Sequence, residues 1–360
     1  MLTHNIPTRI DLEFSKIVTP RELGDCRTQA FCLMLNHYGY KITTQDIFGI
    51  GNGLSFLIQK VNYNGFDLMA LSGRNFEAEM KCCSTIGALC EEKTFEYNPN
   101  IEMEQIPFHM EIIEKVAEGH PVLLQCDVYY MTYLTNIKRN HNEYHMVIVL
   151  GYDLDKKELT VLDSVSNDIH KIDMHQMYKA MFEKQYDEEK KPRWYVFEKL
   201  TKKEQLVRIS SDIYIKSLSE QGKYMNEKDG PLESMKTIHE FLMSIRKRAE
   251  MGSLSHEKYL AFTIEMNSIM LRRQDELNGT CFRSLYIKFL KDMFEQKIIE
   301  REKWTSLVRI LNDLEDKWKI ITFKIRYFKG SVIEKSDIFL SALEQIYSLE
   351  KILTMELMNI

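Results

Sequence analysis

The sequence predicts an α+β fold, in which residues 1–200 form a part with an antiparallel sheet and residues 201–360 form an all-helical part. The division into two parts rests on a change of composition near residue 200. Before it, stretches rich in β-branched and aromatic residues are punctuated by glycine, as is typical of strands. After it, long runs rich in Leu, Ile, Met, Lys and Glu follow helical spacing. A chain of 360 residues is long enough for one large or two ordinary domains.

The first part is expected to begin with helices and to continue with strands. Apolar residues at helical spacing predict a helix over 27–38, which Gly39 is placed to end, and a short helix over 44–48. Strands are expected over 121–130, 145–152 and 158–163. Turn-like residues separate the last two, so these should form an antiparallel hairpin. A helix over 173–183 and a strand over 193–199 complete this part.

The second part is expected to contain only helices. After a polar connection around 219–231, Pro231 fits the first turn of a helix. The predicted helices cover 202–219, 232–250, 254–274, 281–297, 300–327 and 335–358. Such long amphipathic helices need an apolar partner surface, which could be the first part or a second copy of the chain. This part could therefore serve as a lid, as a docking surface for a partner protein or as the contact of a homodimer.

Composition and charge exclude several classes of partner. The chain is 44% hydrophobic and 28% charged, and its net charge of −5 gives no electrostatic case for binding nucleic acid. No apolar run approaches the roughly 20 residues of a membrane span, so no membrane partner is expected. The first residues lack a secretory signal pattern, so we expect a cytoplasmic protein. The odd count of seven cysteines argues against a disulfide framework. No metal site is expected, because Cys82, Cys83 and Cys90 lack a C-x-x-C pair and a nearby histidine.

Three residues, far apart in the sequence, suggest nucleophilic catalysis. Cys26 stands at the start of the predicted helix over 27–38, where free amide groups and the helix dipole stabilise a thiolate. His145 begins a strand that is apolar on both faces, and Asp163 lies on the neighbouring strand. A cysteine nucleophile, a histidine base and a carboxylate that orients the base form a known catalytic set. Each residue alone could be structural, but together, on these elements, they favour catalysis.

Short motifs around these residues resemble a known family. They are Gly24-Asp25-Cys26 with the helix after it, the Phe48–Leu54 loop, Gly119–Val122, Asp127–Tyr130 and His145–Asp153. In this order they resemble the N-terminal domain of the butirosin biosynthesis protein H family, over roughly residues 20–200. The helical remainder resembles, more weakly, the uncharacterised domain that commonly follows it. Asp25 departs from the histidine that family members often carry before the cysteine, and a carboxylate there could disfavour the thiolate unless it points away.

The resemblance implies a papain-like fold and acyl transfer from a carrier-protein thioester to an amine. Carried over by motif, Cys26 would be the nucleophile, His145 the base and Asp163 the orienting residue. Residues 18–23 contain no glutamine for an oxyanion hole, so backbone amides or Gln29 would serve there. Gly51 belongs to a loop that lacks the pattern of a phosphate loop and could line the acyl pocket. Asp127, Tyr129 and Tyr133 could line the substrate cleft or belong to an ordinary strand end.

Three functions remain open from the sequence. The leading one is an acyltransferase of antibiotic or other specialised-metabolite biosynthesis. Its partners would be an acyl carrier protein, for which the helical part could be the docking surface, and a small amine acceptor. It would bind no cofactor of its own, since phosphopantetheine would arrive on the carrier protein. The alternatives are a cysteine hydrolase, either peptidase or amidase, and a non-catalytic binding or assembly module.

Overall fold

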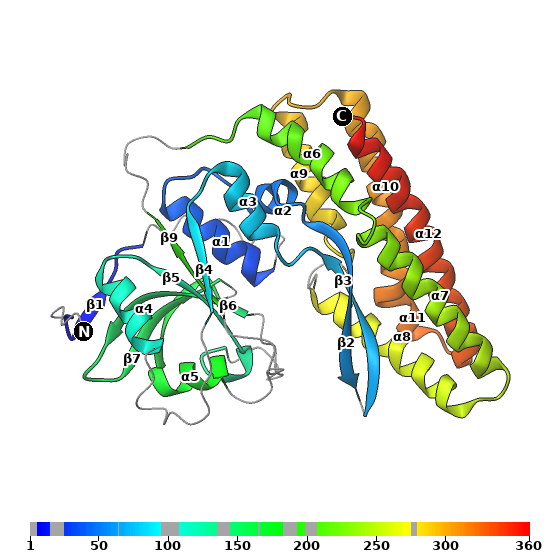
Figure 1. Ribbon diagram of the computed structural model, residues 1–360, viewed down its shortest axis with the longest axis horizontal. Coiled ribbons are helices and arrows are strands. Elements are labelled where there is room, and N and C mark those ends of the chain that lie inside the picture. Colours follow the sequence, from blue (N-terminus) through cyan, green and yellow to red (C-terminus); the bar gives the residue numbers. More distant parts are fainter. Residues whose placement is uncertain are drawn as a thin grey trace. The chain divides into compact units, whose positions relative to one another are not determined.

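Contacts within the chain define two units in the computed structural model (Figure 1). The structure describes residues 6–14, 25–63, 65–94, 108–134, 145–164, 166–182, 193–198, 207–274 and 279–360. Unit 1 consists of the described residues of Met1–Arg21, Cys26–Ile42 and Gly87–Arg208. Unit 2 consists of those of Glu22–Asp25, Thr43–Ile86 and Ile209–Ile360. The predicted division at residue 200 differs from these units, because residues 43–86 group with the C-terminal helices.

Unit 1 is built on one antiparallel sheet with seven strands among the described residues. Its strands are β1 (Arg9–Asp11), β4 (Cys90–Thr94), β5 (Val122–Cys126), β6 (His145–Asp153), β7 (Glu158–Asp163), β8 (Asp168–Asp173) and β9 (Arg193–Phe197). Its helices are α1 (Cys26–His37), α4 (Phe108–Ala117), the 3₁₀ turn η2 (Val128–Tyr130) and α5 (Met174–Phe182). The strand order is β4-β9-β5-β6-β7-β8, and β1 pairs with the C-terminal end of β6, beyond the last residue paired with β5.

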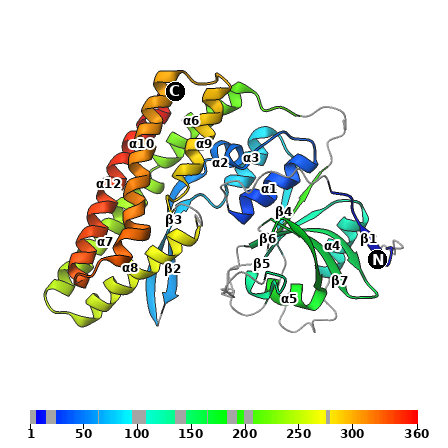
Figure 2. The same ribbon diagram turned by 180° about the vertical axis from the view of Figure 1, so that it is seen from behind.

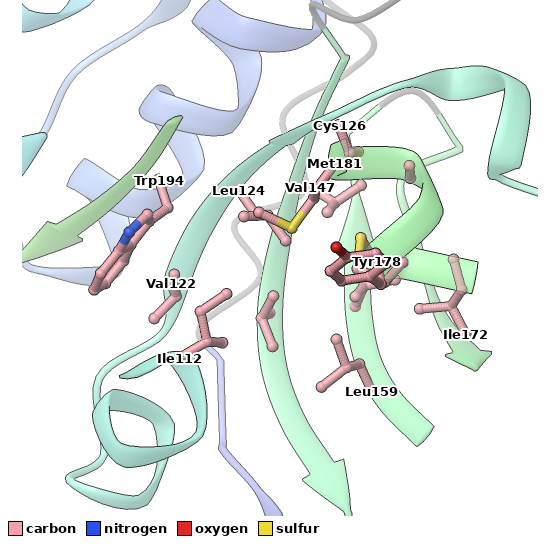
Figure 3. Packing of buried hydrophobic residues seen from close by; sticks show 14 of the residues in the cluster. Ile112, Val122, Leu124, Cys126, Val147, Leu159, Ile172, Tyr178, Met181 and Trp194 are labelled. Carbon is pink, nitrogen blue, oxygen red and sulfur yellow. The ribbon is translucent and has the colours of Figure 1, made fainter. Parts of the chain in front are cut away.

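One face of this sheet forms the main core of unit 1 (Figure 3). Because successive side chains of a strand point to opposite faces, alternate residues of β5, β6 and β9 enter this core. They include Val122 and Leu124, Val147, and Trp194. They pack with Ile112 of α4 and with Tyr178 and Met181 of α5. The central strands are therefore held by apolar packing along their whole length.

Helix α1 packs with the remaining side chains of the same strands. The ring of Phe31 meets Tyr195 and Phe197 edge-on, with centroids 5.0 and 5.8 Å apart. These two residues alternate along β9 with Trp194, which belongs to the core on the other face. The sheet is thus covered on both faces, which explains why β6 is buried along its whole length.

Unit 2 combines a β-hairpin with helices (Figures 1 and 2). Its first elements are α2 (Thr44–Ile50), β2 (Leu54–Tyr63), β3 (Phe66–Arg74) and α3 (Ala78–Ile86). The later ones are α6 (Ser211–Met225), α7 (Pro231–Glu250), α8 (Leu254–Gln274), α9 (Arg283–Glu295), α10 (Arg301–Lys319), the π-helical turn η3 (Ile320–Lys324), α11 (Ile325–Tyr327) and α12 (Val332–Met358). Helix α12 packs along α6, α7 and α10, so the long helices cover one another.

Buried polar side chains join the hairpin of unit 2 to its helices. Gln221 of α6 bonds to both backbone groups of Leu54, at 3.0 and 2.9 Å. The Asn267 side chain of α8 accepts from the amide of Leu71 at 2.7 Å. These bonds satisfy backbone groups that the two-stranded hairpin leaves unpaired. They give the physical reason why residues 43–86 group with the C-terminal helices.

The predicted fold class is confirmed at the level of an α+β chain with an antiparallel sheet and a helical C-terminal region. Helix α1, the β6–β7 hairpin and Pro231 at the start of α7 lie where the sequence predicts them. The strand expected over 121–130 ends at Cys126. The first C-terminal helix begins at Ser211, and the expected start at 202 lies outside the described residues. In the part of the chain that the structure describes, no helix has the length and apolar character needed to cross a membrane.

Candidate active site

Strands β6 and β7 bring His145 and Asp163 together at one end of their hairpin. Val147 is paired with Asp163 in the register, which places His145 diagonally across from the carboxylate. The ring Nε2 of His145 lies 2.8 Å from Oδ2 of Asp163. His145 is 3% exposed and Asp163 is fully buried, so this hydrogen bond is shielded from water. The β-bulge of this hairpin falls farther along, between Val149 and Gly151, and leaves the pairing at the site end regular.

Cys26 is the first residue of α1 and is half-buried. The amide groups of a first helical turn have no partner within the helix, so they favour an anion beside them. The hydroxyl of Ser164, the residue directly after β7, donates to the carbonyl oxygen of Cys26 at 3.0 Å. The start of α1 is therefore tied to the strand that carries Asp163.

His145 interacts with both Asp163 and Cys26. Burial acts to lower the pKa of His145, but hydrogen bonds to Asp163 and Cys26 and the negative charge on both groups raise it to about 10. Because Asp163 occupies Nε2, Nδ1 is the ring nitrogen available to the thiol. At neutral pH the imidazole therefore holds a proton between a carboxylate and a sulfur. This is the arrangement that a thiolate–imidazolium pair requires.

The charged residues on either side of Cys26 are both engaged. The Asp25 carboxylate pairs with the guanidinium of Arg74, which also binds the fully buried Glu79 at 2.5 Å. The negative charge that stands before Cys26 is therefore paired with a cation, which Asp25 shares with Glu79. On the other side, buried Arg27 donates to the hydroxyl of Tyr195 at 3.1 Å.

A second cysteine, Cys126, lies directly opposite His145 in the β5–β6 register. It is fully buried. Burial raises the pKa of its thiol well above the usual range, and negative charge on Asp163, Cys26 and Asp127 raises it further. A thiol that resists ionisation is a poor nucleophile. Position and exposure therefore both favour Cys26.

The predicted substrate-binding residues of unit 1 lie on α1, at the turn η2 and beside Asp163. Gln29 is half-buried on α1, less than one turn after Cys26. Asp127 is buried, and its carboxylate accepts from the amide of Tyr129 at 3.0 Å, which caps η2. Tyr129 is half-buried and meets Tyr130 edge-on. The hydroxyl of Tyr133, by contrast, donates to Oδ2 of Asp163 at 2.9 Å. Tyr133 thus joins the His145–Asp163 pair.

Gly51 belongs to unit 2, where it follows the last turn of α2. A Cβ atom at this position would lie 2.0 Å from the carbonyl oxygen of Ala78. Close packing against α3 is therefore sufficient reason for a glycine at this position.

The cysteines considered as metal ligands are divided between the units. Cys82 and Cys83 lie on α3 in unit 2, and Cys90 begins β4 in unit 1. Within the described ranges, no three His, Cys, Asp or Glu side chains gather as metal ligands would.

Sequence reasoning missed Ser164, Arg74 and the bond from Tyr133 to Asp163. Ser164 directly follows Asp163, but a serine at a strand end carries no signal of its own. Asp25 and Arg74 are 49 positions apart in the sequence, and no local pattern links them. Only the fold could reveal these contacts.

Comparison with known proteins gives one family match. Residues 25–164 match the family model described as butirosin biosynthesis protein H, N-terminal. The predicted family resemblance is confirmed over this range, which begins one residue before Cys26 and ends one residue after Asp163. No curated protein matches the chain.

Proposed function

Residues 25–164 match the family model described as butirosin biosynthesis protein H, N-terminal. On this basis we propose that the chain is a cysteine-dependent acyltransferase with a papain-like catalytic domain. The family's name points to biosynthesis of an antibiotic, and the proposal places the chain in such a pathway. Cys26 is the nucleophile, His145 the acid and base, and Asp163 the orienting residue. The observation that carries the proposal is the contact of His145 with both Cys26 and Asp163.

The acyl donor is a thioester on the phosphopantetheine arm of a carrier protein. In the first step, the Cys26 thiolate attacks the thioester carbonyl and forms a tetrahedral oxyanion. Free amides at the start of α1 stabilise this oxyanion, with Gln29 as a further candidate donor. The intermediate then releases the phosphopantetheine thiolate, which takes the proton from His145. Because one thioester replaces another, the acyl-enzyme forms at little thermodynamic cost.

The second step transfers the acyl group to a small amine. The proton has left His145 and the Cys26 thiolate has been consumed, so the neutral imidazole can act as a base. It takes a proton from the amine as nitrogen attacks the acyl-enzyme, and an amide forms. Collapse releases the Cys26 thiolate beside a protonated His145, which restores the starting state. The hydrogen bond to Asp163 holds the ring in one orientation through both steps.

Intact-protein mass spectrometry tests this proposal directly. The full chain is mixed with carrier protein loaded with a series of acyl groups, without an amine. We expect a mass increase equal to one acyl group, located on the peptide that contains Cys26. Cys26→Ala should give no increase. Asp163→Asn should form the acyl-enzyme on the order of 100-fold more slowly, because His145 loses its anionic partner.

Cys90→Ser is the matched control, since Cys90 is another half-buried cysteine of unit 1. It should acylate at the wild-type rate. Amide formation that continues in Cys26→Ala would rule out the covalent route. If the wild-type chain takes no acyl group and forms no amide from any donor, the acyltransferase proposal fails. Release of free acid in the presence of abundant amine would instead identify a hydrolase.

A further inference from the structure

Tyr133, His170 and Ser166 form a closed ring of contacts with the carboxylate of Asp163. Oδ2 accepts from the Tyr133 hydroxyl at 2.9 Å. The Tyr133 ring stacks on His170, with centroids 4.1 Å apart and planes 9° from parallel. His170 Nε2 lies 2.8 Å from the hydroxyl of Ser166. The Ser166 amide then donates back to Oδ1 of Asp163 at 3.3 Å.

We propose that Tyr133 is a positioning residue that fixes Asp163 for its bond to His145, and that His170 holds Tyr133 in place. The inference rests on the proposed function for its catalytic meaning, since Tyr133 acts through Asp163 and not on the acyl group. It assigns to Tyr133 a role different from the substrate contact that the sequence suggested.

The geometry leaves the carboxylate little freedom to rotate. Oδ1 is held by the turn after β7, and Oδ2 receives donors from both Tyr133 and His145. The backbone after β7 is fixed as well, because the amide of Asn167 donates to the carbonyl oxygen of Asp163 at 2.8 Å. A carboxylate held from both sides offers His145 an acceptor at one position.

The Tyr133 hydroxyl also stays protonated, so that it can donate a hydrogen bond. Burial raises the pKa of its hydroxyl, and the negative charge of Asp163 raises it further, so the hydroxyl keeps its proton. Stacking on His170 fixes the plane of the ring and hence the direction of the hydroxyl. His170 lies on β8, which pairs with the strand that carries Asp163. Neighbouring strands of one sheet therefore hold the acceptor of the Tyr133 hydroxyl and the ring that stacks on Tyr133.

The Tyr133 hydroxyl is one of the two donors that fix Oδ2 of Asp163. Its removal should let the carboxylate rotate, so that the His145–Asp163 hydrogen bond becomes longer and weaker. A side chain that only fills space would leave that bond unchanged. The Nε2 proton of His145 reports it, because a proton in a stronger hydrogen bond resonates farther downfield.

The test uses the full chain with labelled histidine, measured by NMR at neutral pH. The Nε2 proton of His145 is assigned by its absence in His145→Gln. In Tyr133→Phe, which keeps the ring and removes the hydroxyl, we expect this proton to move upfield. Tyr130→Phe makes the same chemical change three positions earlier and should leave the resonance in place. An unchanged or downfield resonance in Tyr133→Phe overturns the inference.

A second variant keeps the inference testable if Tyr133→Phe does not fold. His170→Ala removes the stacked ring and should move the same proton in the same direction by a smaller amount. His170→Phe supplies a ring again and should restore most of the wild-type position. If His170→Ala has no effect, or His170→Phe does not reverse it, His170 does not hold Tyr133.

The result can be separated from the outcome of acyl transfer. If Cys26 takes no acyl group but the His145 proton moves as expected, the proposed function fails and the positioning role of Tyr133 stands. If Cys26 is acylated and the proton does not move, the proposed function stands and Tyr133 has no positioning role.

Discussion

The protonation of His145 depends on partners at both of its ring nitrogens. Asp163 accepts from Nε2, and Cys26 is the other group whose hydrogen bond raises the pKa of the ring. Burial alone would act in the opposite direction, since a desolvated imidazole prefers to be neutral. The charged ring is therefore a product of two specific contacts. Removal of either contact should therefore lower the pKa of His145.

We predict that His145 makes the stability of the fold depend on pH. Its folded-state pKa is raised from 6.5 to about 10. Its contribution to the free energy of unfolding is therefore fully present below pH 6.5 and is lost as the pH rises through about 10. The free energy of unfolding of the wild-type chain should therefore fall, relative to His145→Gln, between these values. Urea unfolding of both proteins at pH 6, 8 and 10 measures this difference. A difference that stays constant or grows with pH would contradict the prediction.

At the scale of elements, strand β6 holds the site and the N-terminal strand of unit 1 together. Its first residue, His145, pairs with Cys126 of β5, and its last residues pair with β1. Gly151 lies at the β-bulge where the pairing with β7 shifts, and it pairs with Asp11 of β1. A Cβ atom there would lie 2.3 Å from the carbonyl oxygen of Ile10, so the close approach of β1 requires glycine.

Gly151→Ala should therefore displace β1 and destabilise the chain by about 1–3 kcal/mol, the usual cost of overpacking. Thermal and urea unfolding measure this loss. Ile169→Ala is the control on the same sheet, because Ile169 is 58% exposed and should change stability by less than about 0.5 kcal/mol. Wild-type stability in Gly151→Ala would show that β1 does not pack against β6 at this point.

At the scale of the whole molecule, the hairpin and helices of unit 2 meet at a buried ion pair. Arg283 and Glu350 are 0% and 1% exposed and lie 2.5 Å apart. The guanidinium also donates to the carbonyl oxygen of Gly73 on β3 at 2.9 Å and lies over the ring of Trp318. A single arginine thus links β3, α9, α10 and α12, elements from distant parts of the sequence.

We predict that Glu350→Gln destabilises the chain by about 3 kcal/mol or more, because it leaves the Arg283 guanidinium buried without a compensating charge. Urea unfolding followed by circular dichroism measures the loss, since unit 2 contains long helices. Glu344→Gln, at an exposed position of the same helix, should be nearly neutral. Equal stability of the two variants would mean that Glu350 does not compensate Arg283.

Local pattern was enough to predict much of the fold. Helix α1 and the helices from α7 onward follow apolar periodicity, and the β6–β7 hairpin follows a turn between apolar runs. The hairpin of β2 and β3 was missed, because it packs against helices α7 and α8, which lie more than 150 positions later in the sequence. The π-helical turn at Ile320–Lys324 interrupts a helix that the sequence predicted as continuous over 300–327. Both features depend on packing that no local window contains.

The sequence by itself was enough to propose Cys26, His145 and Asp163 as a candidate site, since each has a local signal at a helix start or on a strand. It also predicted the helix and the strands that carry these three residues, because periodicity is a local property. Only the tertiary structure decided which groups complete the site. Tyr133, Ser164 and His170 reach their positions through strand register and side-chain stacking, and Asp25 meets Arg74 through the fold of unit 2. Such contacts join residues whose separation in sequence carries no signal, so physical packing alone selects them.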